Sequence, residues 1–367
     1  MNTRYAFEDP LLRELTRSRP VQRLTRIGFL GAVDRIQSRN WHTRHDHSVG
    51  VARLALLYAK NRGLSRHDTR VLAVAGLLHD VGHGPLSHTL EPIFKRQFGI
   101  THHKAGFEII RGESSLGREI LKALTRHRLD PDEIIAMIEG THRGRHAFLF
   151  SSPINLDTID GVTRCRSFFL RTRPDVQSAE RIVQTMSETD TPPIRTLDSF
   201  WQLKHQMYNS AIHNRLGLLY DGLAQAVVTQ DIDDFVPSDF LRDEEQLRRG
   251  KRRLFTLLDR ARRSPRTLRR ELSHPILSHE VDVPRRTFFC NTSVALKTSA
   301  DLIFRYGQNK TCHNIPLIDL IPTGDPTNCS YQIVQGEFSM LARSAPTAAS
   351  RRCARPLGAD SATTRAS

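Results

Sequence analysis

The sequence has few cysteines, and their arrangement excludes two common classes of small structural protein. Its 367 residues include five cysteines, an odd number, and none of them stands in a CxxC pair. A disulfide framework or a zinc ribbon needs closely spaced cysteines, so neither is indicated. The five are Cys165, Cys290, Cys312, Cys329 and Cys353. We therefore predict a protein of the reducing cytoplasm.

Long hydrophobic runs are also missing. The longest apolar run extends only from Val71 to Leu78, whereas a helix needs roughly 20 apolar residues to span a bilayer. The opening residues, MNTRYAFEDPLLRELTRSRP, carry charges throughout, unlike the apolar core of a signal peptide. We expect neither a signal peptide nor a membrane partner.

Acidic residues are the minority charge. The chain has 39 Asp and Glu against 54 Lys and Arg, a formal net charge of +15, which favours anionic partners such as nucleotides or nucleic acids. The segment Arg248–Arg270 holds eleven basic residues and one acid, Asp259. Two interpretations stay open for it: a solvated helical face, or a surface for nucleic acid or phosphate.

Helical periodicity dominates the chain up to about residue 280. Apolar residues at helical spacing, together with capping residues such as Ser65 and Asp130, mark the expected helices. The predicted helices cover residues 48–60, 65–78, 101–112, 130–139, 152–169 and 198–228. The fold class is therefore predicted to be mainly α.

The amino-acid composition changes after Val281, where β-branched and aromatic residues become frequent. It changes again after Ala342, where small, polar and basic residues follow. These changes delimit the last two of five regions that we predict, a small α+β accessory region over 281–341 and a disordered basic tail over 342–367. The first three, which rest on the helical pattern and on the family resemblance described below, are a helical N-terminal arm over 1–40, a catalytic core over 41–175 and a helical extension completing the pocket over 176–280.

Histidines and aspartates gather in four short segments. These are Arg44–His47, the pair His79-Asp80 at the end of an apolar run, the pair His102-His103, and Asp157. A divalent cation needs several imidazole or carboxylate ligands that converge from rigid elements. A buried carboxylate such as Asp80 is costly unless a metal, an ion pair or a helix cap compensates it. We favour a metal, held by His47, His79, Asp80 and Asp157.

Taken together, these segments resemble the HD-domain metal-dependent phosphohydrolase superfamily. The similarity is carried by RxxHSxGV over 44–51, AGLLHDVGHGPLSH over 75–88, THHKAG over 101–106 and DTIDGVTR over 157–164. It is greatest for the branch that contains the deoxynucleoside triphosphate triphosphohydrolases, which PVQRLTRIGFLG over 20–31 also fits. The resemblance covers about residues 8–230 and implies an HD-domain helical bundle in the core.

The resemblance also implies roles for individual residues. The four ligand candidates occupy the metal positions of the superfamily. His83, Glu91 and His102 match a catalytic group that positions or protonates the phosphate, although the branch often has Asp in place of Glu91. Arg44, His88 and Lys204 fall at positions that contact phosphate.

Three positions depart from the deoxynucleotide enzymes. Phe29 stands where that branch typically has Gln, and Gly161 and Cys165 stand where it has Tyr and Asp around the sugar. Groups that hydrogen-bond a sugar discriminate strongly between substrates. The sequence therefore predicts retained phosphate chemistry without the usual deoxyribose contacts.

The resulting hypothesis is a metal-dependent phosphohydrolase acting on a phosphate ester or anhydride of a nucleotide or a related substrate. One alternative is a deoxynucleoside triphosphate triphosphohydrolase proper. Another is a non-catalytic module that binds a nucleotide or, through Arg248–Arg270, a nucleic acid. The ligand set suits Mn, Fe, Zn, Ni or Mg, as one ion or two. Relatives commonly assemble, so a homo-oligomer is a further expectation.

Overall fold

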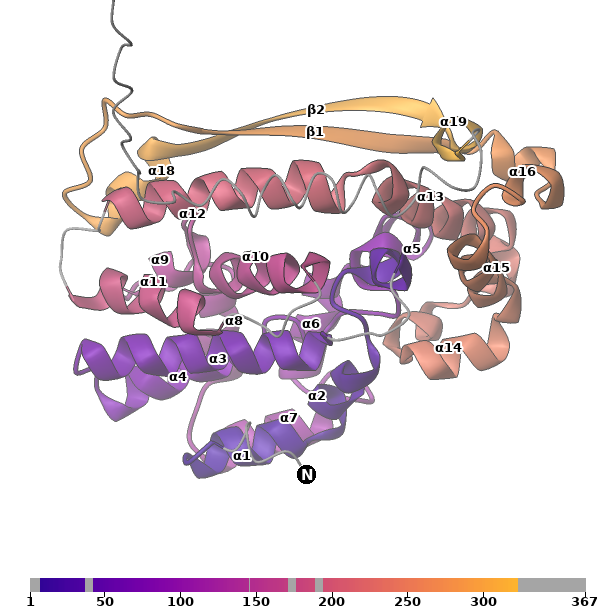
Figure 1. The fold of residues 1–367 in the computed structure, drawn as a ribbon. Coiled ribbons are helices and arrows are strands. Elements are labelled where there is room, and N and C mark those ends of the chain that lie inside the picture. Colours follow the sequence, from indigo (N-terminus) through magenta and orange to yellow (C-terminus); the bar gives the residue numbers. More distant parts are fainter. Residues whose placement is uncertain (1–6, 37–41, 145, 171–175, 189–193, 323–367) are drawn as a thin grey trace, which may run out of the picture.

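Helices make up most of the structure, a computed structural model that describes residues 7–36, 42–144, 146–170, 176–188 and 194–322 (Figure 1). The α-helices are α1 (Pro10–Arg17), α2 (Arg19–Arg23), α3 (Arg44–Asn61), α4 (Arg66–Leu78), α5 (Glu91–Phe98), α6 (His102–Ile110), α7 (Arg118–Arg126), α8 (Pro131–Ile138), α9 (Phe148–Ser151), α10 (Leu156–Phe169), α11 (Val176–Glu188), α12 (Ile194–Gln206), α13 (Arg215–Gln230), α14 (Glu244–Gly250), α15 (Arg252–Arg263), α16 (Leu268–Glu271), α17 (His274–Leu277), α18 (Leu302–Arg305) and α19 (Leu317–Leu320). One antiparallel pair of strands, β1 (Glu280–Cys290) and β2 (Tyr306–Pro316), completes the described fold. The prediction of a mainly α fold with a small C-terminal α+β region is confirmed.

Helices α3 and α4 lie side by side (Figure 1). A Cβ on Gly76 of α4 would lie 3.0 Å from the Ala52 backbone nitrogen of α3, so the absence of a side chain lets the two backbones approach. Thr43 and Asp46 form a capping box at the start of α3. Ser65 caps α4, as its sequence predicted.

Several expected helix boundaries were wrong. Helix α3 begins at Arg44 rather than at Ser48, after the cap Thr43. Helix α10 begins at Leu156 rather than near Ser152, because the Asn155 side chain accepts a hydrogen bond from the Thr158 backbone N–H at 2.7 Å. The single helix expected over 198–228 is interrupted by a π-helical turn over Met207–Ile212. Helix α13 then starts after a new cap, Asn214, whose side chain accepts from Gly217 N–H at 2.7 Å.

The β1–β2 hairpin lies along α12 and α13 (Figure 1). The Trp201 indole N–H donates to the Phe289 carbonyl at 3.1 Å, which ties the hairpin to α12. Gly222 on α13 allows the other end to approach, since a Cβ there would lie 2.5 Å from Val281 Cγ2. The expected disordered tail over 342–367, and residues 323–341 of the accessory region, lie outside the described residues.

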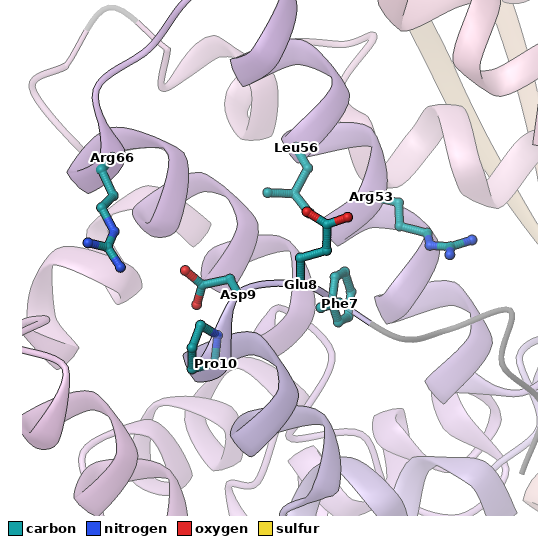
Figure 2. A pocket seen from close by; sticks show the side chains of 7 residues that line it. All are labelled: Phe7, Glu8, Asp9, Pro10, Arg53, Leu56 and Arg66. Atoms are coloured by element: carbon teal, nitrogen blue, oxygen red, sulfur yellow. The ribbon is translucent and has the colours of Figure 1, made fainter.

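The N-terminal segment packs across the outside of α3 and α4. Asp9 caps α1 and accepts a hydrogen bond from Arg70 Nε of α4 at 2.9 Å. A hollow of about 580 Å³ lies beside this crossing (Figure 2). It is lined by Phe7, Glu8, Asp9, Pro10, Arg53, Leu56 and Arg66.

Two further observations concern membrane-spanning helices and cysteines. None of the helices in the described ranges has the length and apolar character needed to cross a membrane. The described cysteines, Cys165, Cys290 and Cys312, are all free thiols. The five-region division of the chain stays a prediction.

We predict that Gly82→Ala destabilises the protein and disturbs helix α6. A Cβ on Gly82 would lie 2.0 Å from the His102 carbonyl oxygen and 2.3 Å from the Gly106 backbone nitrogen. Because backbone atoms would have to move, the free energy of unfolding should fall by about 1 to 3 kcal/mol. Urea unfolding measures this change.

Gly106→Ala is the matched control, because it adds a methyl group to the other side of the same contact. Its Cβ would lie 3.5 Å from the Gly82 backbone nitrogen, an ordinary van der Waals distance. Alanine also favours a helix over glycine by about 1 kcal/mol. Equal destabilisation by the two variants would contradict this account of the Gly82 contact.

Candidate metal centre

Three helix ends bring the four predicted metal ligands together. His47 lies in the first turn of α3, His79 and Asp80 follow the end of α4, and Asp157 lies in the first turn of α10. His47 Nε2 is 2.9 Å from Asp157 Oδ1 and 3.2 Å from His79 Nε2. Asp80 Oδ2 is 3.6 Å from His47 Nε2 and 3.5 Å from His79 Nε2.

The hydrogen bonds of the Nδ1 atoms of His47 and His79 determine the protonation of the two Nε2 atoms that face each other. His79 Nδ1 lies 2.8 Å from the Gly76 carbonyl oxygen, which can only accept, so this nitrogen carries the proton. His47 Nδ1 donates in the same way to Asp160 Oδ2, 2.6 Å away. In neutral imidazoles the two Nε2 lone pairs would therefore point at each other and repel.

A divalent cation relieves that repulsion, and the spacing suits one. Two nitrogens bound to one metal at about 2.1 Å each lie about 3.0 to 3.4 Å apart in octahedral or tetrahedral geometry. The distance between the two Nε2 atoms, 3.2 Å, falls within this range. His47, His79 and Asp157 thus offer three converging ligand atoms, with Asp80 adjacent to them.

The electrostatics of the centre favour positive charge. Burial alone would lower the pKa of His79, but the carboxylates of Asp80 and Asp157 outweigh it and raise the pKa to about 9. Burial would also raise the pKa of Asp157, yet the neighbouring imidazoles of His47 and His79 hold it well below its usual range. The surrounding carboxylates therefore stabilise either a proton or a metal ion between the imidazoles.

Asp80 has a second partner, Arg44. Arg44 Nη1 lies 2.7 Å from Asp80 Oδ2, and both side chains are buried. Burial would raise the pKa of Asp80, but the charges of His79 and Arg44 outweigh it and keep the carboxyl ionised. The ion pair considered from the sequence as an alternative to a metal is therefore present, at the same carboxylate that faces the imidazoles.

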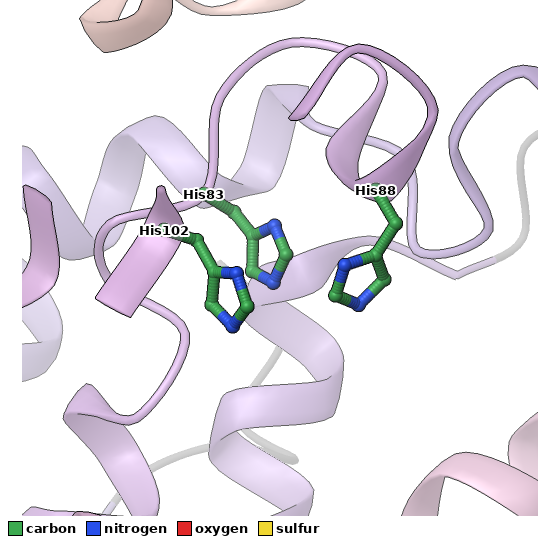
Figure 3. Close-up of side chains that lie close together, drawn as sticks. All are labelled: His83, His88 and His102. Atoms are coloured by element: carbon green, nitrogen blue, oxygen red, sulfur yellow. The ribbon is translucent and has the colours of Figure 1, made fainter. Parts of the chain in front are cut away.

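A second histidine cluster lies beside Asp80 and consists of His83, His88 and His102, whose rings converge in Figure 3. The His83 and His102 rings stack with centroids 4.1 Å apart. Glu91 Oε1 lies 2.6 Å from His102 Nδ1 and accepts from its backbone N–H at 2.9 Å. Glu91 Oε2 is 3.2 Å from His88 Nδ1. One glutamate thus holds two of the three rings.

His83 differs from its neighbours because neither ring nitrogen has a hydrogen-bond partner within the described residues. Its Nε2 lies 3.2 Å from Asp80 Oδ1 without hydrogen-bond geometry. Burial and the charge of Arg44 lower the pKa of His83 well below its ordinary value. It is therefore a neutral, buried imidazole that links the two clusters.

A cavity of about 850 Å³ opens onto the centre. Its lining includes Arg44, His88, Glu91 and Asp157. Lys204, the third predicted phosphate contact, does not line it. The Lys204 ammonium donates to the Pro153 carbonyl at 3.3 Å, and burial lowers its pKa to about 8.

The three positions that depart from the deoxynucleotide enzymes all line this cavity, as Phe29, Gly161 and Cys165. The Phe29 ring packs under the Arg44 guanidinium, 5.1 Å away, and beside the His47 ring at 4.7 Å. A Cβ on Gly161 would lie 3.9 Å from Asp157 Oδ1, so this glycine adjoins the centre. The wall near the metal centre is consequently apolar at these positions.

Asp160 and Arg164 form a supporting pair that was not predicted from the sequence. Arg164 holds Asp160 through two hydrogen bonds, of 2.8 and 2.9 Å, while Asp160 orients His47. Burial would raise the pKa of Asp160, but Arg164 outweighs it and lowers the pKa to about 2. Both residues belong to the DTIDGVTR motif, and their spacing of four on a helix was the signal that could have identified them.

Basic residues of the segment Arg248–Arg270 have acidic partners. Arg248 pairs with Asp259 at 3.2 Å and Arg249 with Glu245 at 2.5 Å. Arg260 lies 3.5 Å from Glu271. These three basic residues are thus paired, as expected for a solvated helical face, and a surface for nucleic acid or phosphate stays the alternative.

We predict that Asp160→Asn weakens divalent metal binding by about 10- to 100-fold, because the carboxylate that orients His47 is lost. Calorimetric titration with Mn²⁺ or Zn²⁺ measures the affinity, after circular dichroism has confirmed that the variant is folded. The control is Asp132→Asn, which removes a carboxylate from an exposed pair with Arg111. Unchanged metal affinity in folded Asp160→Asn would contradict the orienting role.

Known proteins are similar to the part of the chain that carries the candidate metal centre. The family model described as "HD domain" matches residues 44–197. Uncharacterized protein MG461 of Mycoplasma genitalium is 28% identical over 240 residues, covering 56% of this chain and 55% of that protein. Deoxynucleoside triphosphate triphosphohydrolase SAMHD1 of Danio rerio is 36% identical over 92 residues, covering 23% of this chain and 15% of that protein.

The chain spans about half, or less, of the length of the curated relatives it matches. A solved phosphohydrolase structure from Bacteroides thetaiotaomicron has a similar fold, with a TM-score of 0.52 and 18% identity, covering 77% of this chain and 76% of that one. The metal-ligand candidates and the second histidine cluster lie within the matched HD domain. Residues 44–197 therefore match the HD domain, and the chain is similar over part of its length to proteins named as deoxynucleoside triphosphate triphosphohydrolases.

Proposed function

We propose that this protein is a metal-dependent phosphohydrolase that cleaves a phosphate ester or anhydride of a nucleotide or a related substrate. The observation that carries the proposal is the convergence of two imidazole Nε2 atoms and Asp157 beside an Arg44–Asp80 pair, of which Arg44 and Asp157 line one cavity. His47, His79 and Asp157 hold the metal, with Asp80 as the fourth ligand. A divalent ion bound there would polarise a phosphoryl oxygen and lower the pKa of a water molecule bound to it.

Arg44 binds the phosphate in this proposal. Its guanidinium is held from three sides, by Asp80, by Ser87 Oγ at 3.0 Å from Nε, and by the Phe29 ring. A fixed guanidinium at the cavity wall stabilises negative charge as it develops on the phosphate, without reorganising during the reaction. His88, which lines the same cavity, is the second phosphate contact.

The second histidine cluster moves protons. His102 donates its Nδ1 proton to Glu91, which leaves Nε2 free to exchange a proton with a water or a leaving oxygen. His83 stacks on His102 and stays neutral, so it keeps a hydrogen-bond donor and an acceptor available. Glu91 orients His102, as a carboxylate commonly does for a catalytic imidazole.

A deoxynucleoside triphosphate triphosphohydrolase proper is the second candidate, supported by the similarity to SAMHD1. The apolar wall formed by Phe29, Gly161 and Cys165 argues for a different sugar contact in this chain. Release of inorganic triphosphate from a deoxynucleotide would identify that activity. A non-catalytic binding module is the remaining alternative.

We predict that metal-loaded protein releases phosphate, pyrophosphate or triphosphate from at least one nucleotide or phosphodiester, and that Asp80→Ala lowers the rate by roughly 100-fold or more. The substitution removes a metal ligand and the partner of Arg44 together. The assay uses Mn²⁺, Fe²⁺, Zn²⁺, Ni²⁺ and Mg²⁺ with a panel of nucleoside mono-, di- and triphosphates, and identifies the products by chromatography.

Asp233→Ala, on an exposed acid, is the control for the loss of one carboxylate. Its rate should equal that of the wild type. Hydrolysis unaffected by Asp80→Ala would contradict the assigned site. Metal-loaded protein that hydrolyses nothing, yet binds a nucleotide tightly, would favour the binding module.

A further inference from the structure

The β1–β2 hairpin forms the wall of the cavity on the side of the C-terminal region. Asp282, Pro284 and Arg286 alternate along β1 and line the cavity, as does Val281 near the start of the strand. Lys310 and Cys312 of β2 line it as well. This wall belongs to a part of the chain outside the matched HD domain.

Arg286 and Lys310 stand directly opposite each other in the hairpin. Like charges at opposed positions of an antiparallel pair destabilise it, and the two side chains leave the sheet on the same face. The strand register thus places Lys310 opposite Arg286, at a position where an acidic residue would have neutralised the charge of Arg286. An anion bound between the two cations would compensate the repulsion.

Arg286 is held in place while part of its hydrogen-bonding capacity stays unused. Its guanidinium lies over the Tyr208 ring at 4.9 Å, and its backbone carbonyl accepts from Asn209 Nδ2 at 2.8 Å. The Nε atom is buried and has no hydrogen-bond partner among the described residues. A guanidinium fixed by stacking, with a donor left over, suits recognition of phosphate.

His213 adds a third group to this wall. It lines the cavity, its ring lies 5.7 Å from Tyr208, and its Nδ1 is buried without a partner in the described part of the chain. Burial, followed by the charges of Arg286 and Lys310, lowers the pKa of His213 to about 4. The imidazole is therefore neutral and leaves the positive charge of the wall to Arg286 and Lys310.

The wall is not uniformly basic, which limits where an anion fits. Asp282 lies on the same face four residues from Arg286, about 13 Å along the strand at roughly 3.3 Å per residue, and the residue opposite it is Asn314. An anion is therefore favoured at the Arg286 end and disfavoured at the Asp282 end.

We propose that Arg286, Lys310 and His213 form an anion subsite that binds a second phosphate group of the substrate, apart from the phosphate held at the metal centre. This inference rests on the proposed function, because it assigns the scissile phosphate to Arg44 and the metal. The substrate class is accordingly a nucleotide with more than one phosphate, such as a nucleoside polyphosphate or a nucleoside bisphosphate.

Binding without turnover tests the subsite. Full-length wild type, Arg286→Gln and Arg285→Gln are titrated by calorimetry, in EDTA, with adenosine 5′-monophosphate, adenosine 5′-triphosphate and adenosine 3′,5′-bisphosphate. Arg285 is the matched control, since it lies next to Arg286 on the opposite face of β1, is exposed and carries the same charge. Thermal unfolding checks each fold, and Arg286→Gln should be at least as stable as the wild type because it relieves the like-charge pair.

Arg286→Gln should weaken binding of at least one compound with several phosphates by about 10-fold or more, and binding of the monophosphate by much less. Arg285→Gln should change none of the three affinities comparably. Equal losses in the two variants, or no selective loss in Arg286→Gln, would overturn the subsite. Arg286-dependent binding in a protein without phosphohydrolase activity would instead refute the proposed function and leave the subsite in place.

Discussion

The structure depends on one electrostatic constraint, which is the approach of two imidazole nitrogens to 3.2 Å inside a ring of carboxylates. His47 and His79 each donate a hydrogen bond from Nδ1, to Asp160 and to the Gly76 carbonyl, so their Nε2 atoms face each other. Such a pair needs a positive charge between its members, either a proton or a metal ion. The high pKa of His79 shows how strongly Asp80 and Asp157 favour that charge.

The fold meets this constraint by gathering helix ends. The capping box at Thr43 starts α3 one residue before Arg44, and the cap at Asn155 starts α10 two residues before Asp157. Helix α4 ends as His79 and Asp80 begin, and the close contact at Gly82 brings α6 and His102 against the same turn. Caps and tight backbone contacts therefore set the positions of the ligands, while the hydrophobic core holds the helices that carry them.

The four ligand candidates, which the sequence motifs and the family resemblance suggested together, lie near one another in the structure, and their binding of a metal stays a prediction. The caps that place two of them, Thr43 and Asn155, were not predicted from the sequence. Short motifs say less about residues whose position depends on distant contacts. The Lys204 ammonium lies over the Trp201 ring at 4.5 Å and donates to the Pro153 carbonyl, and its contact with phosphate stays a prediction. Arg286 reaches the cavity only because the hairpin folds back onto α12 and α13, through contacts at Phe289 and Gly222 that no short motif reveals. Asp160 lies within the motif DTIDGVTR, but its role in orienting His47 could be identified only from the direction of the His47 ring in the structure.

The central claim is that one divalent ion binds between His47 and His79. Anomalous diffraction from crystals of the Mn²⁺-, Zn²⁺- or Fe²⁺-loaded protein, recorded on both sides of the metal absorption edge, tests it most directly. We predict a single strong peak bonded to His47 Nε2, His79 Nε2 and Asp157, with Asp80 adjacent. A metal bound only in the second histidine cluster, or no stoichiometric metal in the folded protein, would contradict the account.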